Sequence, residues 1–182
     1  NWENPKVRET LFDVANFWVD KGVGGFRVDA ITYIKKPNPM VDGEVDGADN
    51  RAGIHKMTAN TEGILDFLHE FKEKVQEGTD IFVVGEANGV PKEQLDDWVG
   101  ENGVFDMIFS FDLVNIQFAA GEYWYNTKDF SLTEFKKIIS SLQTQSDDVW
   151  NPIFFENHDQ PRSVNHFLAE DADSVEGAKA LA

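Results

Sequence analysis

The feature that most constrains the fold is a repeated alternation between strand-like and helix-like stretches, joined by connections too long for hairpins. Short apolar runs that predict strands lie at residues 26–31, 81–84, 107–111 and 153–155. Patterns of helical period lie at residues 5–21, 60–77, 91–99 and 131–142, and another helix begins near residue 174. Because the connections carry helices, successive strands are expected to run parallel with right-handed crossovers. The fold class is therefore α/β, and a doubly wound sheet and a closed barrel both fit the pattern.

Local signals mark where two of these helices start. Asn4 and Pro5 place an N-cap before a proline at the first helical position, and Ser131 with Glu134 has the form of a capping box. The first helix carries an apolar face made of Val7, Leu11, Val14, Phe17 and Trp18. The second carries one made of Ile64, Phe67, Leu68, Phe71 and Val75. The helix at 131–142 is expected to bury Leu132, Phe135, Ile138, Ile139 and Leu142.

One connection, residues 35–57, is a polar loop that is long for a compact domain, which indicates a functional or mobile segment. Its stretch 42–47 resembles the first half of a calcium-binding loop. The second half does not fit, because the twelfth position is Gly53 rather than Glu and the eighth is Asp49. We expect a solvated acidic loop and no metal site. Three histidines lack partners at metal-ligand spacing and are expected to be surface or packing residues: His55, His69 and His166.

Composition excludes several classes of function. Lys and Arg number 16 against 33 Asp and Glu, a formal charge of -17 that repels nucleic acid and anionic membrane surfaces. No cysteine is present, so disulfides, a thiolate nucleophile and zinc–thiolate sites are excluded. No strand is followed by a glycine-rich phosphate fingerprint, and no run of about 18 apolar residues predicts a membrane span. We expect a cytoplasmic protein with a neutral or cationic ligand and no cofactor, and the oligomeric state stays open.

Charged residues lie on or directly after the first two predicted strands. Arg27 and Asp29 are two apart and share one face of a strand, while Phe26 and Val28 face the flanking helices. Such an inward pair is either an internal salt bridge or a ligand site. Glu86 comes directly after the second apolar run, at the strand end where α/β folds place their ligands.

A third carboxylate, Asp159, lies in the dense polar cluster at 155–162, directly after the last predicted strand. Carboxylates that follow three parallel strands of one sheet are expected to converge at one mouth. Glycoside hydrolysis needs two of them, one to attack the anomeric carbon and one to protonate the leaving oxygen. A third carboxylate and a nearby His can bind sugar hydroxyls more strongly as the ring flattens towards the transition state.

At these residues the sequence resembles the α-amylase family of glycoside hydrolases (family 13), within it the α-glucosidase and oligo-1,6-glucosidase group. Three segments resemble the motifs after the family's fourth, fifth and seventh strands: Gly25-Phe26-Arg27-Val28-Asp29-Ala30, Val84-Gly85-Glu86 and Asn157-His158-Asp159-Gln160-Pro161-Arg162. Two further stretches, 1–5 and 84–90, also resemble this group. The resemblance covers essentially the whole chain. It implies that residues 1–182 are the central part, about strands 4 to 7, of a (β/α)8 TIM barrel catalytic domain, with two open sheet edges.

The resemblance also implies roles at each motif. Asp29 would be the nucleophile of a retaining mechanism, Arg27 its positioning partner, and Glu86 the general acid and then base. Asp159 and His158 would hold hydroxyls of the transferred glucose, and Arg162 would line the same pocket.

The residue after the nucleophile bears on linkage in this group, where Val accompanies α-1,6 cleavage and Ala or Thr accompanies α-1,4 preference. Ala30 therefore favours a short α-1,4 oligosaccharide such as maltose as substrate. An oligo-1,6-glucosidase, a trehalose-6-phosphate hydrolase and a sucrose isomerase share the motifs and remain alternatives, as does a non-catalytic binding subunit. A fragment of the barrel is expected to be inactive by itself and to self-associate.

Overall fold

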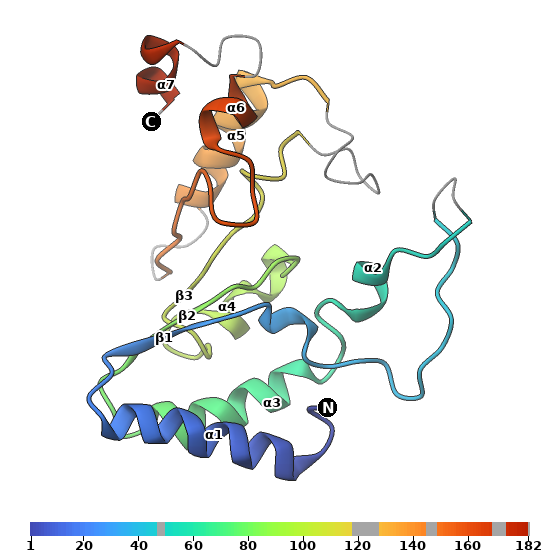
Figure 1. Ribbon diagram of the computed structural model, residues 1–182, viewed down its shortest axis with the longest axis vertical. Coiled ribbons are helices and arrows are strands. Elements are labelled where there is room, and N and C mark those ends of the chain that lie inside the picture. The colour runs from blue at the N-terminus through green and yellow to red at the C-terminus, as the bar shows by residue number, and fades with distance from the viewer. Residues whose placement is uncertain (47–49, 118–127, 145–148, 169–173, 182) are drawn as a thin grey trace. The chain divides into compact units, whose positions relative to one another are not determined.

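The computed structural model describes residues 1–46, 50–117, 128–144, 149–168 and 174–181 (Figure 1). They belong to two compact units, one made of Asn1–Phe109 with Ser146–Pro152 and the other of Ser110–Gln145 with Ile153–Ala182. Within the described ranges, no helix combines the length and the apolar character that crossing a bilayer requires.

The first unit is built on a three-stranded sheet. Its strands are β1 (Gly25–Val28), β2 (Phe82–Gly85) and β3 (Met107–Ile108), hydrogen-bonded in the order β1-β2-β3. Both pairs are parallel, and the register sets Val28 beside Gly85 and Gly85 beside Ile108. The predicted parallel sheet is confirmed for these three strands. β1 is shorter than the predicted run of 26–31, because the chain turns after Asp29 into a short 3-10 helix, η1 (Ile31–Tyr33).

The helices of the first unit follow the predicted pattern. α1 (Pro5–Asp20) begins at the predicted cap, where Asn4 Oδ1 accepts the Lys6 N–H at 3.0 Å. α3 (Ile64–Phe71) runs on into a π-helical turn, η2 (Lys72–Gln76), and lies beside α1 (Figure 1). The stretch predicted at 91–99 forms η3 (Lys92–Gln94) and α4 (Leu95–Trp98). The predicted loop at 35–57 is wrong at its end, where residues 54–57 belong to the helix α2 (Ile54–Thr58).

The core of the first unit lies between the sheet and its helices. Phe26 and Val28 pack against this core whereas Arg27 is exposed, so the predicted alternation of faces along β1 is confirmed. The buried members of this core come from η1, α3, β2, α4 and β3 and from the residues between them. They include Ile31, Ile64, Leu68, Val83, Trp98, Phe105 and Ile108.

The apolar face of α1 is largely uncovered. Leu11, Val14, Phe17 and Trp18 are 41 to 53% exposed, while Phe12 is the buried residue of this helix. The helix turns Phe12 towards α3, where its ring lies 6.1 Å from that of Phe71. The apolar stripe therefore exists as predicted, but no described part of the first unit packs over it.

The loop before α2 uses one of its acidic residues internally. Asp46 binds Lys56 Nζ at 2.7 Å and accepts the Gly53 N–H at 2.8 Å. Lys56 first, and the Gly53 N–H second, lower the pKa of this carboxyl. Residues 47–49 of the calcium-like stretch and its flank lie outside the described residues. Across the described part of the chain, no three His, Cys, Asp or Glu residues are grouped to hold a metal ion.

The second unit is helical, with α5 (Leu132–Gln143), α6 (Ser163–Phe167) and α7 (Val175–Leu181). The predicted capping box is confirmed at its Ser131 half, because Ser131 Oγ accepts the Glu134 N–H at 3.3 Å. Phe135 and Leu142 are buried as predicted. The prediction for Leu132 is wrong: it is 50% exposed, because it occupies the first helical position, before the turn that joins the core.

The strand predicted at 153–155 is not formed. These residues adopt no regular secondary structure, although Ile153 and Phe155 pack on the core of the second unit, made of Leu113, Ile116, Phe135 and Phe167. The Phe155 ring lies 6.2 Å from that of Phe135. The apolar run is therefore satisfied by side-chain packing rather than by a hydrogen-bonded ladder, and the described sheet holds three of the four predicted strands.

Candidate active site

Asp29 and Glu86 leave the sheet at the same edge. The register pairs Val28 with Gly85, so the next residue of each strand is one of the two carboxylates. The ladder continues past the strands, because the Glu86 N–H donates to Val28 O at 2.8 Å and the Ile31 N–H donates to Glu86 O at 3.1 Å. The structure thus sets both carboxylates side by side at the carboxyl ends of adjacent parallel strands.

Arg27 binds both carboxylates. Its Nη2 lies 2.9 Å from Glu86 Oε2, and its Nη1 contacts Asp29 Oδ1. The internal salt bridge that the sequence allowed is present, and it extends to the second carboxylate. Since one guanidinium offsets two carboxylates, the group keeps a net negative charge. The side chain of Asp29 is 75% exposed and that of Glu86 only 12%, so Asp29 is the accessible carboxylate and Glu86 the enclosed one.

Ala30 turns the chain directly after Asp29. Its φ is 42° and its ψ 40°, in the left-handed region that residues with a Cβ seldom adopt. The Ala30 N–H donates to Glu86 Oε2 at 3.0 Å. The two residues that follow, Ile31 and Thr32, are 3% and 0% exposed and anchor the turn in the core.

Tyr33 is a further residue of this site, and the sequence analysis missed it. Burial first, and the negative charge of Glu86 second, raise the pKa of its phenol above the ordinary 10.0. The signal that could have found it is its position, as a polar aromatic residue in the segment directly after β1, where ligands bind in α/β folds.

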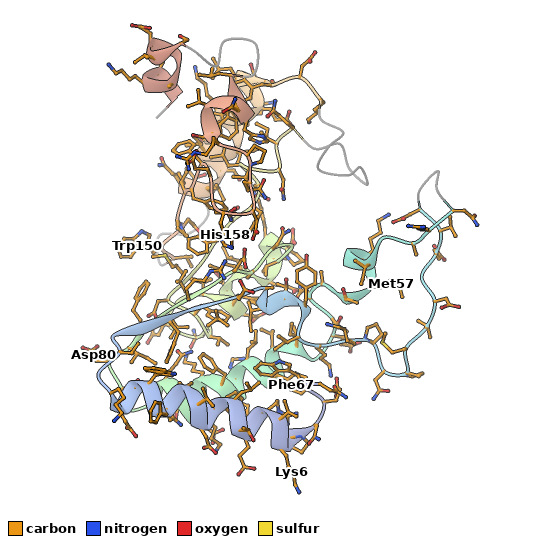
Figure 2. All side chains as sticks on the ribbon, in the orientation of Figure 1. Lys6, Met57, Phe67, Asp80, Trp150 and His158 are labelled. Atoms are coloured by element: carbon orange, nitrogen blue, oxygen red, sulfur yellow. The ribbon has the colours of Figure 1, made fainter. Side chains whose placement is uncertain are left out.

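The second unit holds the other predicted site residues, and His158 is labelled in Figure 2. His158 Nε2 lies 3.3 Å from Asp159 Oδ2, and both side chains are exposed. The Asp159 N–H donates to Asn157 Oδ1 at 2.9 Å, a turn that orients the backbone of this pair. His158 and Asp159 thus lie together as one polar group, and the convergence of Asp159 with Asp29 and Glu86 stays a prediction.

Arg162 binds a residue that the sequence analysis did not single out. Its Nη1 lies 2.6 Å from Glu156 Oε1, and Glu156 Oε2 accepts the Ser163 N–H at 2.6 Å. The hydrogen bond from Ser163, ahead of the charge of Arg162, lowers the pKa of Glu156. Glu156 therefore ties Arg162 to the start of α6, and its place within the dense polar cluster was the available signal.

Comparison with known proteins matches the chain along its whole length. The family model described as "Alpha amylase, catalytic domain" matches residues 1–182. A probable oligo-1,6-glucosidase 3 of Bacillus subtilis (strain 168) is 40% identical over an alignment of 190 residues that covers 100% of this chain and 32% of that protein. An oligo-1,6-glucosidase of Parageobacillus thermoglucosidasius is 36% identical over an alignment of 184 residues, which again covers 100% of this chain and covers 33% of that protein.

Solved structures agree with this match. The crystal structure of isomaltulose synthase from Erwinia rhapontici NX5 superposes with a TM-score of 0.80 at 34% identity, over 92% of this chain and 30% of that one. The chain spans about a third of the length of the curated relatives it matches. Since the family model covers every residue, the chain belongs to the α-amylase family, as part of its catalytic domain.

Proposed function

We propose that this chain is the central part, about strands 4 to 7, of a (β/α)8 barrel enzyme that removes terminal α-linked glucose from short oligosaccharides with retention of configuration. The observation that carries the proposal is the pair of carboxylates, Asp29 and Glu86, bound by one guanidinium at the ends of adjacent strands. Retaining glycosidases hold their two working carboxyls about 5–5.5 Å apart. A single Arg27 side chain that contacts both Asp29 and Glu86 is compatible with so short a separation.

Exposure supports distinct roles for the two carboxylates. Asp29, the exposed one, attacks the anomeric carbon, and its oxygen forms a bond to that carbon. The bond to the leaving oxygen breaks, its electron pair goes to that oxygen, and the proton of Glu86 moves to it. In the second half a water attacks the same carbon, Glu86 takes the proton of that water, and Asp29 is released as a carboxylate.

Arg27 supports both steps from the strand itself. A guanidinium beside Asp29 favours the ionised form that attack requires, and it fixes the direction in which the carboxylate points. Asp159 and His158 hold hydroxyls of the glucose that is transferred, and Arg162 lines the same pocket. These three residues act as binding groups, whose contacts strengthen as the sugar approaches the transition state.

The linkage preference has two indications that point in different directions. Ala30, after the nucleophile, favours α-1,4 links, whereas both curated relatives described above bear the name oligo-1,6-glucosidase. We propose α-1,6 links as the preferred substrate, because the relatives match the whole chain and Ala30 is one position. Trehalose 6-phosphate and sucrose are the remaining candidate substrates, and a non-catalytic binding subunit is the alternative of another class.

A substrate panel tests the proposal on the longer protein that contains this chain. Maltose, isomaltose, sucrose and trehalose 6-phosphate are compared for glucose release, and NMR of the first product records its anomeric form. We expect α-glucose from isomaltose first, no turnover in Asp29→Asn, and about a 10²- to 10⁴-fold slower reaction in Glu86→Gln. Asp80→Asn, an exposed change in the turn before β2, serves as the control and should keep full activity. Inversion to β-glucose would refute the retaining mechanism, and binding of all four sugars without turnover would support the binding subunit.

A further inference from the structure

Two donors meet on one oxygen of Glu86. Arg27 Nη2 lies 2.9 Å from Oε2, and the Ala30 N–H donates to the same Oε2 at 3.0 Å. The main chain of Glu86 is held as well, because its N–H donates to Val28 O and its carbonyl oxygen accepts the Ile31 N–H. The main chain and the side chain of Glu86 are thus both bound to β1 and to the turn that follows it.

This arrangement makes the two oxygens of Glu86 chemically different. Oε2 accepts the Ala30 N–H and lies 2.9 Å from a guanidinium nitrogen, so a proton has no favourable place there, since an O–H would point at a donor or at a cation. The proton of the acid form is therefore confined to Oε1. We infer that the Ala30 main-chain N–H is a positioning group for Glu86, which together with Arg27 keeps Oε2 as an acceptor and presents the catalytic proton on Oε1. The inference rests on the acid/base role proposed above for Glu86.

The left-handed backbone at Ala30 is what this positioning requires. The N–H groups of two consecutive residues donate to Glu86: that of Ala30 to the side-chain Oε2, and that of Ile31 to the main-chain carbonyl oxygen. The two acceptors are different oxygens of one residue, and a left-handed residue bends the backbone so that successive amides can point towards the same neighbour. The φ of 42° is held in place by the burial of Ile31 and Thr32, which together anchor the turn. A strained residue that the surrounding core enforces is typical of functional positions.

The first test uses the longer protein that contains this chain and needs no activity. The amide signal of Ala30 is followed by NMR as pH changes, together with the side-chain carboxyl signal of Glu86. We expect the two to titrate with one midpoint, because the N–H hydrogen bond strengthens when Glu86 ionises. That phase should vanish in Glu86→Gln and persist in Asp29→Asn, which separates it from the neighbouring carboxylate. Among the described residues, the charged or titratable groups beside Glu86 include Arg27, Asp29 and Tyr33.

The chain carries an internal control for this measurement. The Ser163 N–H donates to Glu156 Oε2 at 2.6 Å in the second unit, so the Ser163 amide should titrate with Glu156 in wild type and in Glu86→Gln alike. An Ala30 amide that fails to follow Glu86 while the Ser163 amide follows Glu156 would overturn the inference. This outcome is independent of whether the longer protein hydrolyses any sugar, so the failure of the inference and that of the proposed function are distinguishable.

A second test removes the N–H from the longer enzyme. Replacing the amide N–H of Ala30 by an ester oxygen, with its side chain unchanged, deletes the donor and also makes the Asp29 carbonyl oxygen a weaker acceptor. Turnover of a disaccharide should fall by about tenfold to a hundredfold, since a hydrogen bond to a charged group is lost. Turnover of an aryl glucoside whose leaving group needs no proton should change little. Equal losses on both substrates would mean a structural role only and would overturn the inference.

Discussion

Asp106 is predicted to stabilise the sheet with its side chain. It stands directly before β3, where its Oδ2 accepts the Val83 N–H at 2.6 Å and its own N–H donates to Val83 O at 3.0 Å. The carboxylate therefore replaces the main-chain acceptor that a longer β3 would supply. Val83 is 0% exposed with this carboxylate in place, whereas Asp106 itself is exposed, so water can reach the Val83 N–H only through the space that a shorter side chain leaves. Asp106→Ala should leave a buried donor without an acceptor.

The expected loss follows from that burial. A buried N–H without an acceptor costs about 1–3 kcal/mol, and the lower part of this range applies because Asp106 is exposed and water can partly replace its carboxylate. Asp106→Asn keeps a neutral oxygen in place and should cost about half as much. The chain carries a formal charge of -17, so removing any carboxylate also relieves some repulsion, and the measured loss has to be compared with a variant that loses the same charge elsewhere.

Urea unfolding of the chain measures these losses, and amide hydrogen exchange at Val83 reports on the same hydrogen bond directly. Asp80→Ala is the matched control, because Asp80 is exposed, lies in the turn before β2 and belongs to the same unit. We expect Asp106→Ala to be the least stable, Asp106→Asn intermediate, and Asp80→Ala close to wild type. If the free energy of unfolding of Asp106→Ala lies within about 0.5 kcal/mol of that of Asp80→Ala, the Asp106 carboxylate does not stabilise the sheet and the reasoning is wrong.

Two further predictions concern the second unit and α1. His166 is buried with Nε2 2.9 Å from Val114 O, and burial lowers its pKa below the ordinary 6.5. Because the unfolded chain then binds the proton more readily, the free energy of unfolding should keep the full contribution of His166 above pH 6.5 and lose it as pH falls through the folded pKa. Urea unfolding measured against pH should show this dependence in the wild type. The dependence should disappear in His166→Gln and remain in His69→Gln, which changes an exposed residue. The isolated chain should self-associate through α1, where Val14 and Trp18 are 52% and 50% exposed. Replacing both by Gln should weaken association at least about tenfold in sedimentation, and an unchanged constant would assign it to the sheet edges instead.

Elements with local signals could be predicted, and the end of β1 shows where local signals stop. Asn4 and Pro5 mark the start of α1 because a cap and a fixed φ act within two residues. The strand predicted at 26–31 extends past Asp29, since Ala30 continues the apolar alternation of Phe26 and Val28 and the apolar Ile31 follows it. In the structure Ile31 is buried, as it would be in a strand, but it follows a left-handed turn at Ala30. Burial of a side chain does not report the backbone conformation that achieves it.

The segment at 153–155 and the face of α1 show a second limit. Ile153 and Phe155 satisfy their apolar character by packing on Phe135 and Phe167, so hydrophobicity alone could not say that no ladder forms. The stripe that includes Trp18 was readable as apolar, but what packs against it depends on segments elsewhere in sequence. Pattern predicts which side chains avoid water, whereas pairing depends on partners that the pattern does not identify.

The site shows the same division between residue type and pairing. Spacing alone put Arg27 and Asp29 on one face of β1, and position alone put Glu86 at a strand end. The contact of Arg27 with both carboxylates depends in addition on the register between β1 and β2.

Gly25 enforces that register at the opposite end of β1. A Cβ at this position would lie 2.0 Å from Phe82 O, so the close pairing of Gly25 with Phe82 excludes any side chain there. Sliding β1 by one residue would bring Gly24 or Phe26 to Phe82, and only a glycine tolerates that approach. A slip that paired Gly24 with Phe82 would also move the Arg27 side chain to the opposite face of the sheet, away from Glu86. The glycine at the start of β1 thus selects the one alignment that sets Val28 beside Gly85, and with it Asp29 beside Glu86.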